Sequence, residues 1–156
     1  MPRVGLGIDI HPFQEGRPLV LCGVSIPECQ GLLGHSDGDV AIHALMDAIL
    51  GALGLEDIGH FFPSTPEWKD ASSLELLKIV RGVLKEAGYY LVNADISLVL
   101  EKPRVAPYRE LMMENLKQVF PQAQFSVKAT TSEGLGFIGE NKGAAALAVV
   151  LLETND

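Results

Sequence analysis

An apolar run over residues 40–53 constrains the fold most, because almost every position in it is Val, Ala, Ile, Leu, Met or Gly. Ser36 precedes the run and Asp39 follows three residues later, which is close to the capping box that marks a helix start. We therefore predict a helix over residues 37–53 that is buried nearly all round.

Three ionisable residues interrupt this helix. Asp39, His43 and Asp47 are spaced four apart, so their side chains share one stripe of the helix. A buried charge is costly unless it is paired or bound, so the stripe needs a partner. A lone histidine would indicate a His–Asp pair inside the core. A stripe of three beside His35 and Asp37 favours a metal or phosphate site.

Composition bounds the class of protein. The 156 residues predict one domain, 1–156, and the net charge of −8 argues against binding nucleic acid or an anionic membrane surface. No apolar run is long enough for a membrane span, and Asp9 and His11 interrupt the N-terminal segment, so a signal peptide is not expected. Cys22 and Cys29 allow a disulfide, but we favour reduced thiols and a cytoplasmic protein.

The remaining periodicities predict alternating strands and helices. Apolar and other residues alternate over 3–11, as in a half-buried strand, and Pro12 should end it. The last element, Ala144–Leu152, fits strand or helix, and we favour helix. The other expected elements are strands in 18–26 (possibly a hairpin around Gly23), 89–100 and 125–130, helices over 72–87 and 107–120, and a long loop over 54–71. This order predicts an α/β or α+β fold with helices on one face of a sheet.

Asp9 and His11 are two apart on the first strand, so their side chains leave the same face. The rest of that face is largely glycine, which should leave open space beside them. If His43 faces this pair, the three residues offer the ligand set of a catalytic zinc site with a free fourth position. A surface strand also produces Asp-x-His by chance. A structural zinc would more often use thiolates.

Two further clusters can bind parts of a phosphorylated substrate. Residues 128–134 place three consecutive hydroxyls at a strand exit, where they can hold phosphate oxygens, and Glu133 can ligate Mg²⁺. The alternative is a plain Thr/Ser turn. In Asp57-Ile58-Gly59, the carboxylate can accept hydrogen bonds from the hydroxyls of a sugar or polyol. A helix C-terminal turn explains the same residues.

Together these motifs resemble the 2-C-methyl-D-erythritol 2,4-cyclodiphosphate synthase family. Asp9-Ile-His11, the run from His35 to His43, Asp57-Ile-Gly59 followed by Phe-Pro, and Lys128-Ala-Thr-Thr-Ser-Glu133 stand in the order seen in that family. The resemblance covers essentially the whole chain. It implies an enzyme of non-mevalonate isoprenoid biosynthesis, a phosphorus-oxygen lyase, that cyclises 4-diphosphocytidyl-2-C-methyl-D-erythritol 2-phosphate and releases CMP.

The resemblance also implies an assembly, cofactors and site residues. The fold is a compact α/β unit with a mixed sheet, which assembles as a homotrimer with active sites between subunits. Zinc is held by Asp9, His11 and His43, and Mg²⁺ or Mn²⁺ by Glu133, while His35 and Thr131 stabilise the transition state. The residues implied to contact substrate are Asp9, His11, His35, Ser36, Asp57, Ile58, Gly59, Phe62, Leu100, Lys102, Pro103, Arg104, Val105, Ala106, Ala129, Thr130, Thr131, Ser132, Glu133 and Phe137.

Two other functions compete with this interpretation. A metal-dependent phosphohydrolase would use water on the same metals and give a linear product. A zinc-stabilised binding protein would have no turnover, and loss of its ion would unfold it. The small substrate is the only partner expected besides further copies of the chain.

Overall fold

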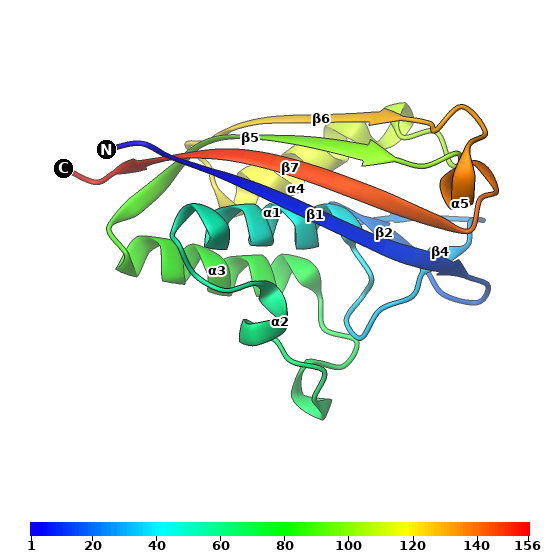
Figure 1. The fold of residues 1–156 in the computed structure, drawn as a ribbon, viewed down its shortest axis with the longest axis horizontal. Helices are drawn as coiled ribbons and strands as arrows, with labels where there is room; N and C mark the ends of the chain where they lie inside the picture. The colour runs from blue at the N-terminus through cyan, green and yellow to red at the C-terminus, as the bar shows by residue number, and fades with distance from the viewer.

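The structure, a computed structural model, describes residues 1–156 as a mixed β-sheet with helices packed on one face (Figure 1). The sheet has five strands in the order β4-β1-β7-β5-β6, antiparallel throughout except for the parallel pair β5–β6. The strands are β1 Arg3–Gln14, β4 Gly31–Leu32, β5 Tyr89–Val99, β6 Gln124–Thr130 and β7 Gly143–Thr154. This α+β architecture confirms the predicted fold class.

The helical layer covers the inner face of the sheet, and α1 lies directly against it (Figure 1). One cluster of 38 buried residues forms the core between the layers. The helices are α1 Val40–Ala52, α2 Ile58–Phe61, α3 Ser73–Glu86, α4 Arg109–Val119 and α5 Gly136–Gly139, with short 3₁₀ turns at Pro66–Trp68 and Ala106–Tyr108. None of these helices has the length and hydropathy that crossing a bilayer requires.

The predicted hairpin around Gly23 is present. Strands β2 (Leu19–Leu21) and β3 (Val24–Ile26) pair antiparallel across a two-residue turn. Cys22 and Gly23 have φ values of 48° and 73°, as a turn of this length needs to match the twist of its strands. Cys22 is buried in the core, and both cysteines of the chain are free thiols.

The last element is a strand, so the prediction of a helix over 144–152 is wrong. β7 is the central strand of the sheet and pairs with β1 on one side and β5 on the other. Its alanines have high helix propensity, but Ala146 and Ala148 alternate with exposed Leu147 and Val149. Two-sided strand pairing therefore decides the conformation, and the small inward residues let α1 lie close.

Other boundaries also differ from the sequence predictions. β1 continues through Pro12 to Gln14, because Pro12 lies opposite Gly143 and the strand then pairs with β4. The segment 54–71 is not one loop, since it holds α2 and a 3₁₀ turn. Asp39, not Ser36, is the N-cap of α1, and its carboxylate accepts a hydrogen bond from the N–H of Ile42.

The faces of β1 are reversed relative to a simple hydrophobic-inward pattern. Gly5 and Gly7 face the core, where a Cβ atom would lie 1.8 Å from the Ala48 carbonyl oxygen and 1.9 Å from that of Ala44, respectively. The backbone of α1 fills the space next to these two glycines, while the open space predicted beside Asp9 and His11 is present as a cavity. Glycine is required because only its missing side chain lets strand and helix approach so closely.

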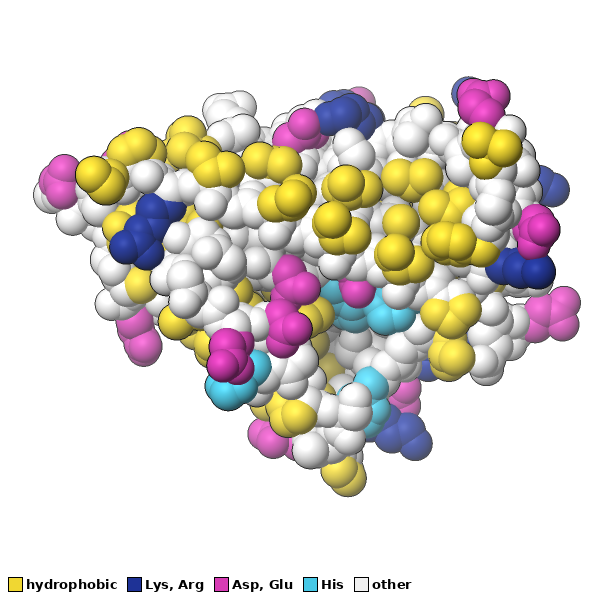
Figure 2. Space-filling model, in the orientation of Figure 1, with side chains coloured by type: hydrophobic (Ala, Val, Ile, Leu, Met, Phe, Trp, Pro, Cys, Tyr) yellow, Lys and Arg dark blue, Asp and Glu magenta, His cyan; other side chains and the backbone are white.

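The opposite face of β1 is apolar and exposed. Its outward side chains form a band that continues onto β7 (Figure 2). We call this the apolar sheet face and define it by Val4, Leu6, Ile8, Ile10, Leu147 and Val149, which are between 38% and 69% exposed. An exposed patch of this kind marks an interaction surface.

The two chain ends lie side by side at one end of the sheet (Figure 1). The amino group of Met1 donates to the Thr154 side-chain oxygen at 3.2 Å, and Arg3 lies opposite Leu152 in the β1–β7 ladder. The free ends are thus held together by the same strand pairing that builds the centre of the sheet.

We expect Gly7→Ala to destabilise the fold by about 2 kcal/mol or more, because the new methyl group would overlap the backbone of α1. Gly82→Ala is the matched control. Nothing lies within 4 Å of a Cβ atom at that α3 position, so the change should stabilise by about 0.5–1 kcal/mol. Urea denaturation of both variants measures the difference. Equal stability of the two would contradict the close packing of β1 on α1.

Candidate metal centre and adjoining cavities

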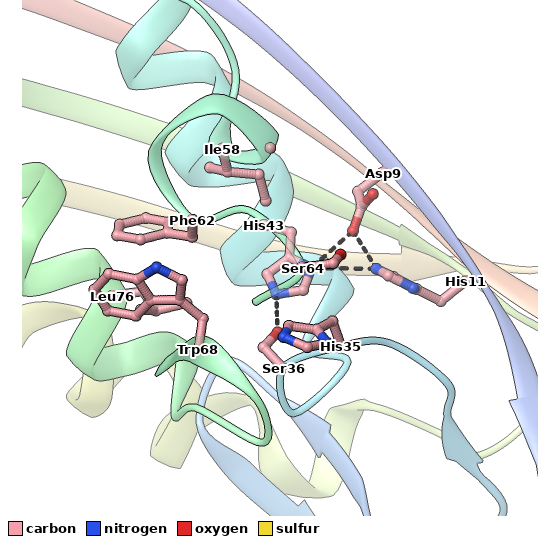
Figure 3. Close-up of a pocket in the computed structure, with 11 residues that line it drawn as sticks. Asp9, His11, His35, Ser36, His43, Ile58, Phe62, Ser64, Trp68 and Leu76 are labelled. Atoms are coloured by element: carbon pink, nitrogen blue, oxygen red, sulfur yellow. Dashed lines mark hydrogen bonds and ion pairs between the residues drawn. The ribbon is translucent and has the colours of Figure 1, made fainter. Parts of the chain in front are cut away.

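Three side chains from two elements converge at one point. Asp9 and His11 extend from β1 and His43 from the buried helix α1, as Figure 3 shows. The Asp9 Oδ2 atom lies 2.7 Å from His11 Nε2 and 3.0 Å from His43 Nδ1, and the two ring nitrogens are 3.1 Å apart. The predicted meeting of His43 with the Asp-x-His pair is confirmed.

The ligand atoms of this triad are all acceptors in the neutral protein. His11 Nδ1 donates its proton to the Leu33 carbonyl oxygen at 2.8 Å, which leaves a lone pair on Nε2. That lone pair faces the Asp9 carboxylate and His43 Nδ1. Acceptors this close repel one another unless a proton or cation lies between them, so two imidazole nitrogens and one carboxylate fit a divalent metal ion.

The ionisation of the triad follows the same logic. Burial raises the pKa of Asp9, but the close contacts of its carboxylate with the His11 and His43 rings, which become donors when protonated, outweigh burial and bring the pKa down to about 2. Burial lowers the pKa of His11, yet its hydrogen bond to Asp9 raises the value above that of a free histidine. Asp9 is thus an anion under all ordinary conditions, and positive charge is favoured beside it.

The triad lines a cavity of about 210 Å³, which we call the metal cavity. Phe62 and Trp68 meet edge to face on one side of it, with ring centroids 5.0 Å apart (Figure 3). The complete lining is Asp9, His11, His35, Ser36, His43, Ile58, Gly59, Phe62, Ser64, Trp68 and Leu76. No lysine or arginine is among them, so the cavity offers an anionic ligand no permanent positive charge.

His35 is held at this cavity by the segment after α2. Its Nε2 donates to the Thr65 carbonyl oxygen at 2.6 Å, which leaves Nδ1 as its acceptor. Asp57 is the N-cap of α2 and accepts a hydrogen bond from the N–H of His60. It therefore begins a helix, not the predicted alternative of a helix C-terminal turn, and its exposed carboxylate does not line the cavity.

The polar stripe on α1 divides among three tasks. Only His43 joins the metal triad. Asp39 accepts backbone hydrogen bonds from Cys22, Gly23 and Ile42, and Asp47 accepts one from Ile58 at the start of α2. The hydrogen bonds to Asp39 connect α1 to the β2–β3 hairpin, and the hydrogen bond to Asp47 connects α2 to α1.

A second cavity of about 370 Å³, which we call the loop cavity, lies between the 100–106 segment and β6. It contains three basic side chains, Arg104, Arg109 and Lys128, and one acid, Glu101. The predicted site residues that line it are Leu100, Pro103, Arg104, Val105, Ala106, Ala129, Thr130 and Thr131. Within one chain this cavity is separate from the metal cavity.

The hydroxyl cluster after β6 is partly occupied by internal hydrogen bonds. The Ser132 N–H and hydroxyl both donate to Glu101 Oε1, and the Glu133 N–H donates to Thr131 Oγ1 at 3.1 Å. The Glu133 side chain is exposed, with φ at 55°. Lys102, Ser132, Glu133 and Phe137 line neither the metal cavity nor the loop cavity, so their contacts to substrate stay predictions.

Several residues at the centre had no assigned role in the sequence. Ser64, Trp68 and Leu76 line the metal cavity, and Ser73 contacts His43 Nε2 at 2.9 Å. Ser73 carried one usable signal, a position at the expected helix start. Trp68 stands in a segment without periodicity, so nothing in the pattern placed it.

Comparison with known proteins gives concordant matches. The YgbB family model matches residues 2–153. The 2-C-methyl-D-erythritol 2,4-cyclodiphosphate synthase of Syntrophomonas wolfei is 54% identical over 154 residues, which cover 97% of this chain and 98% of that protein.

Two solved structures have the same fold. The bifunctional IspDF of Campylobacter jejuni is 43% identical, with a TM-score of 0.95 over 100% of this chain and 43% of that one. IspF of Plasmodium falciparum, solved as a CDP complex, is 36% identical, with a TM-score of 0.86 over 99% of this chain and 97% of that one.

The buried Asp39 carboxylate gives a prediction with a defined pH sign. Burial and the neighbouring Asp37 raise the pKa of Asp39 to about 6, although the hydrogen bonds that it accepts from backbone N–H groups lower it. Because this value exceeds that of the unfolded chain, Asp39 favours the folded state more at pH 5 than at pH 7. We expect the unfolding free energy of the parent, relative to Asp39→Asn, to be larger at pH 5 by about 1 kcal/mol.

Urea denaturation in the presence of a chelator measures this difference without any contribution from bound metal. If the unfolding free energy of the parent minus that of Asp39→Asn were smaller at pH 5 than at pH 7, the raised pKa of Asp39 would be contradicted.

Proposed function

Because the chain belongs to the YgbB family, we propose that it converts 4-diphosphocytidyl-2-C-methyl-D-erythritol 2-phosphate to 2-C-methyl-D-erythritol 2,4-cyclodiphosphate with release of CMP. The alignment with a relative that carries the name of this synthase covers 98% of that protein and 97% of this chain. The reaction places the enzyme in non-mevalonate isoprenoid biosynthesis. By its chemistry it is a phosphorus-oxygen lyase, and residues 1–156 are its catalytic unit.

The convergence of Asp9, His11 and His43 carries this proposal. Three ligands meet at the wall of a cavity and do not enclose the ion, as a catalytic zinc site requires. We infer that these residues hold Zn²⁺ and that Glu133 holds Mg²⁺ or Mn²⁺. When bound, the two ions neutralise phosphate charge and polarise phosphate oxygens.

The substrate supplies its own nucleophile. An oxygen of the 2-phosphate forms a bond to the β-phosphorus, while the bond from that phosphorus to the oxygen of CMP breaks. The protein therefore needs no serine or cysteine nucleophile. Its task is to bend a flexible chain into a ring, and orienting reacting groups in this way is worth effective molarities of roughly 10⁵–10⁸ M.

Residues in and beside the metal cavity divide this task with Thr131 of the loop cavity. His35, fixed through its Nε2 by the Thr65 carbonyl oxygen, stabilises charge on the transferring phosphorus with Thr131. The metal-cavity residues Ser36, Ile58, Gly59 and Phe62 enclose the methylerythritol part, and the exposed Asp57 carboxylate beside the cavity accepts hydrogen bonds from its hydroxyl groups. Phe62 also excludes water from the reacting atoms.

The loop cavity suits the leaving nucleotide. Its basic side chain Arg104 favours the diphosphate, with Lys128, which is also paired with Asp95, and Thr130 and Thr131 offer hydroxyl donors. The segment 100–106 holds the cytidine, with Lys102 at its exposed edge. Ser132, Glu133 and Phe137 complete the phosphate side of this site. CDP in the Plasmodium falciparum complex is a ligand of the same chemical class.

We further propose that the protein is a homotrimer with active sites shared between neighbouring subunits. Each cavity lacks what the other has, because the metal cavity contains no lysine or arginine and the loop cavity contains no metal triad. Joining the metal cavity of one subunit to the loop cavity of the next completes the site. The apolar sheet face supplies the surface that such an association would bury. The cytoplasmic location expected from the sequence stays a prediction.

Incubation of the protein with the CDP-methylerythritol phosphate, Zn²⁺ and Mg²⁺ should release CMP and a cyclic diphosphate in equal amounts, as measured by ³¹P NMR. We expect His35→Ala to lower kcat about 100-fold, because it removes one group that stabilises the transition state. His60→Ala is the matched control, since His60 is exposed and paired with Glu56 outside the metal cavity. It should leave kcat unchanged.

Two results would contradict this function. A linear phosphorylated product would indicate a phosphohydrolase that uses water. A parent protein with no CMP release, together with a His43→Ala variant that unfolds, would indicate a zinc-stabilised binding protein. A catalytic ion instead predicts a folded His43→Ala variant without turnover.

Leu6→Glu should convert the trimer into a monomer, because it places a charge in the buried part of the proposed interface. Leu111→Glu is the matched control, since Leu111 on α4 is 53% exposed, similar to the 59% of Leu6, and lies away from the sheet. Light scattering of the parent and both variants gives the masses. A monomeric parent would contradict both the trimer and the shared active site.

A further inference from the structure

His43 contacts different groups through its two ring nitrogens. Nδ1 faces the Asp9 carboxylate and His11, whereas Nε2 lies 2.9 Å from Ser73 Oγ and 3.0 Å from Ser36 Oγ. Ser73 is fully buried, and Ser36 and His43 are 8% and 5% exposed. The side of His43 that faces away from the metal triad is thus closed to bulk water, and its partners must decide where the ring carries its proton.

The Ser73 hydroxyl has one proton, which it donates in a hydrogen bond to Asp37. Ser73 Oγ donates to Asp37 Oδ1, and the Ser73 N–H donates to Asp37 Oδ2 at 2.9 Å. A carboxylate only accepts hydrogen bonds, so the direction of the first bond is fixed. Because its proton points to Asp37, Ser73 Oγ can only accept a hydrogen bond from His43.

His43 must therefore carry its proton on Nε2. An unprotonated Nε2 would place its lone pair 2.9 Å from the lone pairs of Ser73 Oγ, and the contact would be repulsive. With the proton on Nε2, the ring donates to Ser73 and Ser36, and the lone pair on Nδ1 points at Asp9 and His11. This tautomer is the one that can ligate a cation through Nδ1.

We propose that Asp37 and Ser73 form a positioning pair that fixes the tautomer and the orientation of His43 for metal binding. This inference rests on the proposed metal site, but it assigns a role to two residues that do not touch the ion. The contacts run from the Asp37 carboxylate through the Ser73 hydroxyl and the His43 imidazole to the cation. Outer partners of this kind typically change metal affinity 10–100-fold when they are removed.

The fold makes the pair rigid. Asp37 precedes α1, Ser73 is the first residue of α3, and the side chain of the preceding Ser72 makes no capping hydrogen bond. The Asp37 carboxylate thus substitutes for the missing cap of α3 and also accepts the Asp39 N–H at 3.1 Å. The start of α1, which carries His43, and the start of α3 are therefore held together at the residues that orient the His43 ring.

Asp37→Asn is the decisive variant. When the asparagine oxygen accepts the Ser73 N–H, its amide nitrogen faces Ser73 Oγ and donates to it, which frees the serine proton for His43 Nε2 and moves the histidine proton to Nδ1. We expect Zn²⁺ affinity, measured by chelator competition, to fall 10–100-fold. Ser73→Ala should reduce the affinity less, because Ser36 still accepts from Nε2 at 3.0 Å. Asp70→Asn is the matched control, since the Asp70 side chain is 70% exposed, and it should bind Zn²⁺ like the parent.

The ¹⁵N NMR spectrum of the metal-free protein gives a readout that a merely structural role would not move. We expect a proton on His43 Nε2 in the parent and in Asp70→Asn, and an unprotonated Nε2 in Asp37→Asn. If Asp37→Asn does not fold, the tautomer of the parent and the Zn²⁺ affinity of Ser73→Ala still decide.

An unprotonated His43 Nε2 in the metal-free parent would overturn the inference, as would unchanged Zn²⁺ affinity in both folded variants. These results differ from failure of the proposed function. A parent protein that binds no Zn²⁺ would remove the metal site itself. A parent that binds Zn²⁺ but releases no CMP would remove the proposed reaction and leave the role of Asp37 and Ser73 intact.

Discussion

The contact between the glycine face of β1 and helix α1 determines the rest of the structure. Gly5 and Gly7 bring the strand onto the carbonyl groups of Ala48 and Ala44, a separation that no larger residue permits. Two residues further along the same face comes Asp9, directly beside His43. The packing that brings sheet and helix together therefore also sets the spacing of the triad. Stability and ligand geometry depend on one backbone approach.

The sequence predicted the centre of the site better than its surroundings. Period two places Asp9 and His11 on one face, and the buried helix explains His43, because both patterns are local. The strand β7 was not predictable in this way, since its alanines favour a helix and only pairing with two neighbouring strands overrides that preference. The role of Ser73 depends on the contact of α3 with α1, a tertiary contact that no local pattern encodes.

The sign of charge differs between the two cavities, and this difference explains how a chain with net charge −8 can accept a polyanion. The metal cavity is lined by histidines and a carboxylate, so its positive charge must come from a bound ion. The loop cavity carries its own arginines and a lysine. Global charge says little about a substrate when local groups decide.

The adjacent chain ends, held by Met1 and Thr154, leave both cavities unobstructed. The triad begins at Asp9, further along β1, so a polypeptide joined to either end would start beside the first rungs of the β1–β7 ladder and not beside the ligands. A catalytic unit of this shape can be appended to another enzyme without rebuilding its site. This chain matches 43% of the length of the bifunctional IspDF of Campylobacter jejuni. Fusion at either chain end is thus compatible with the geometry of the triad.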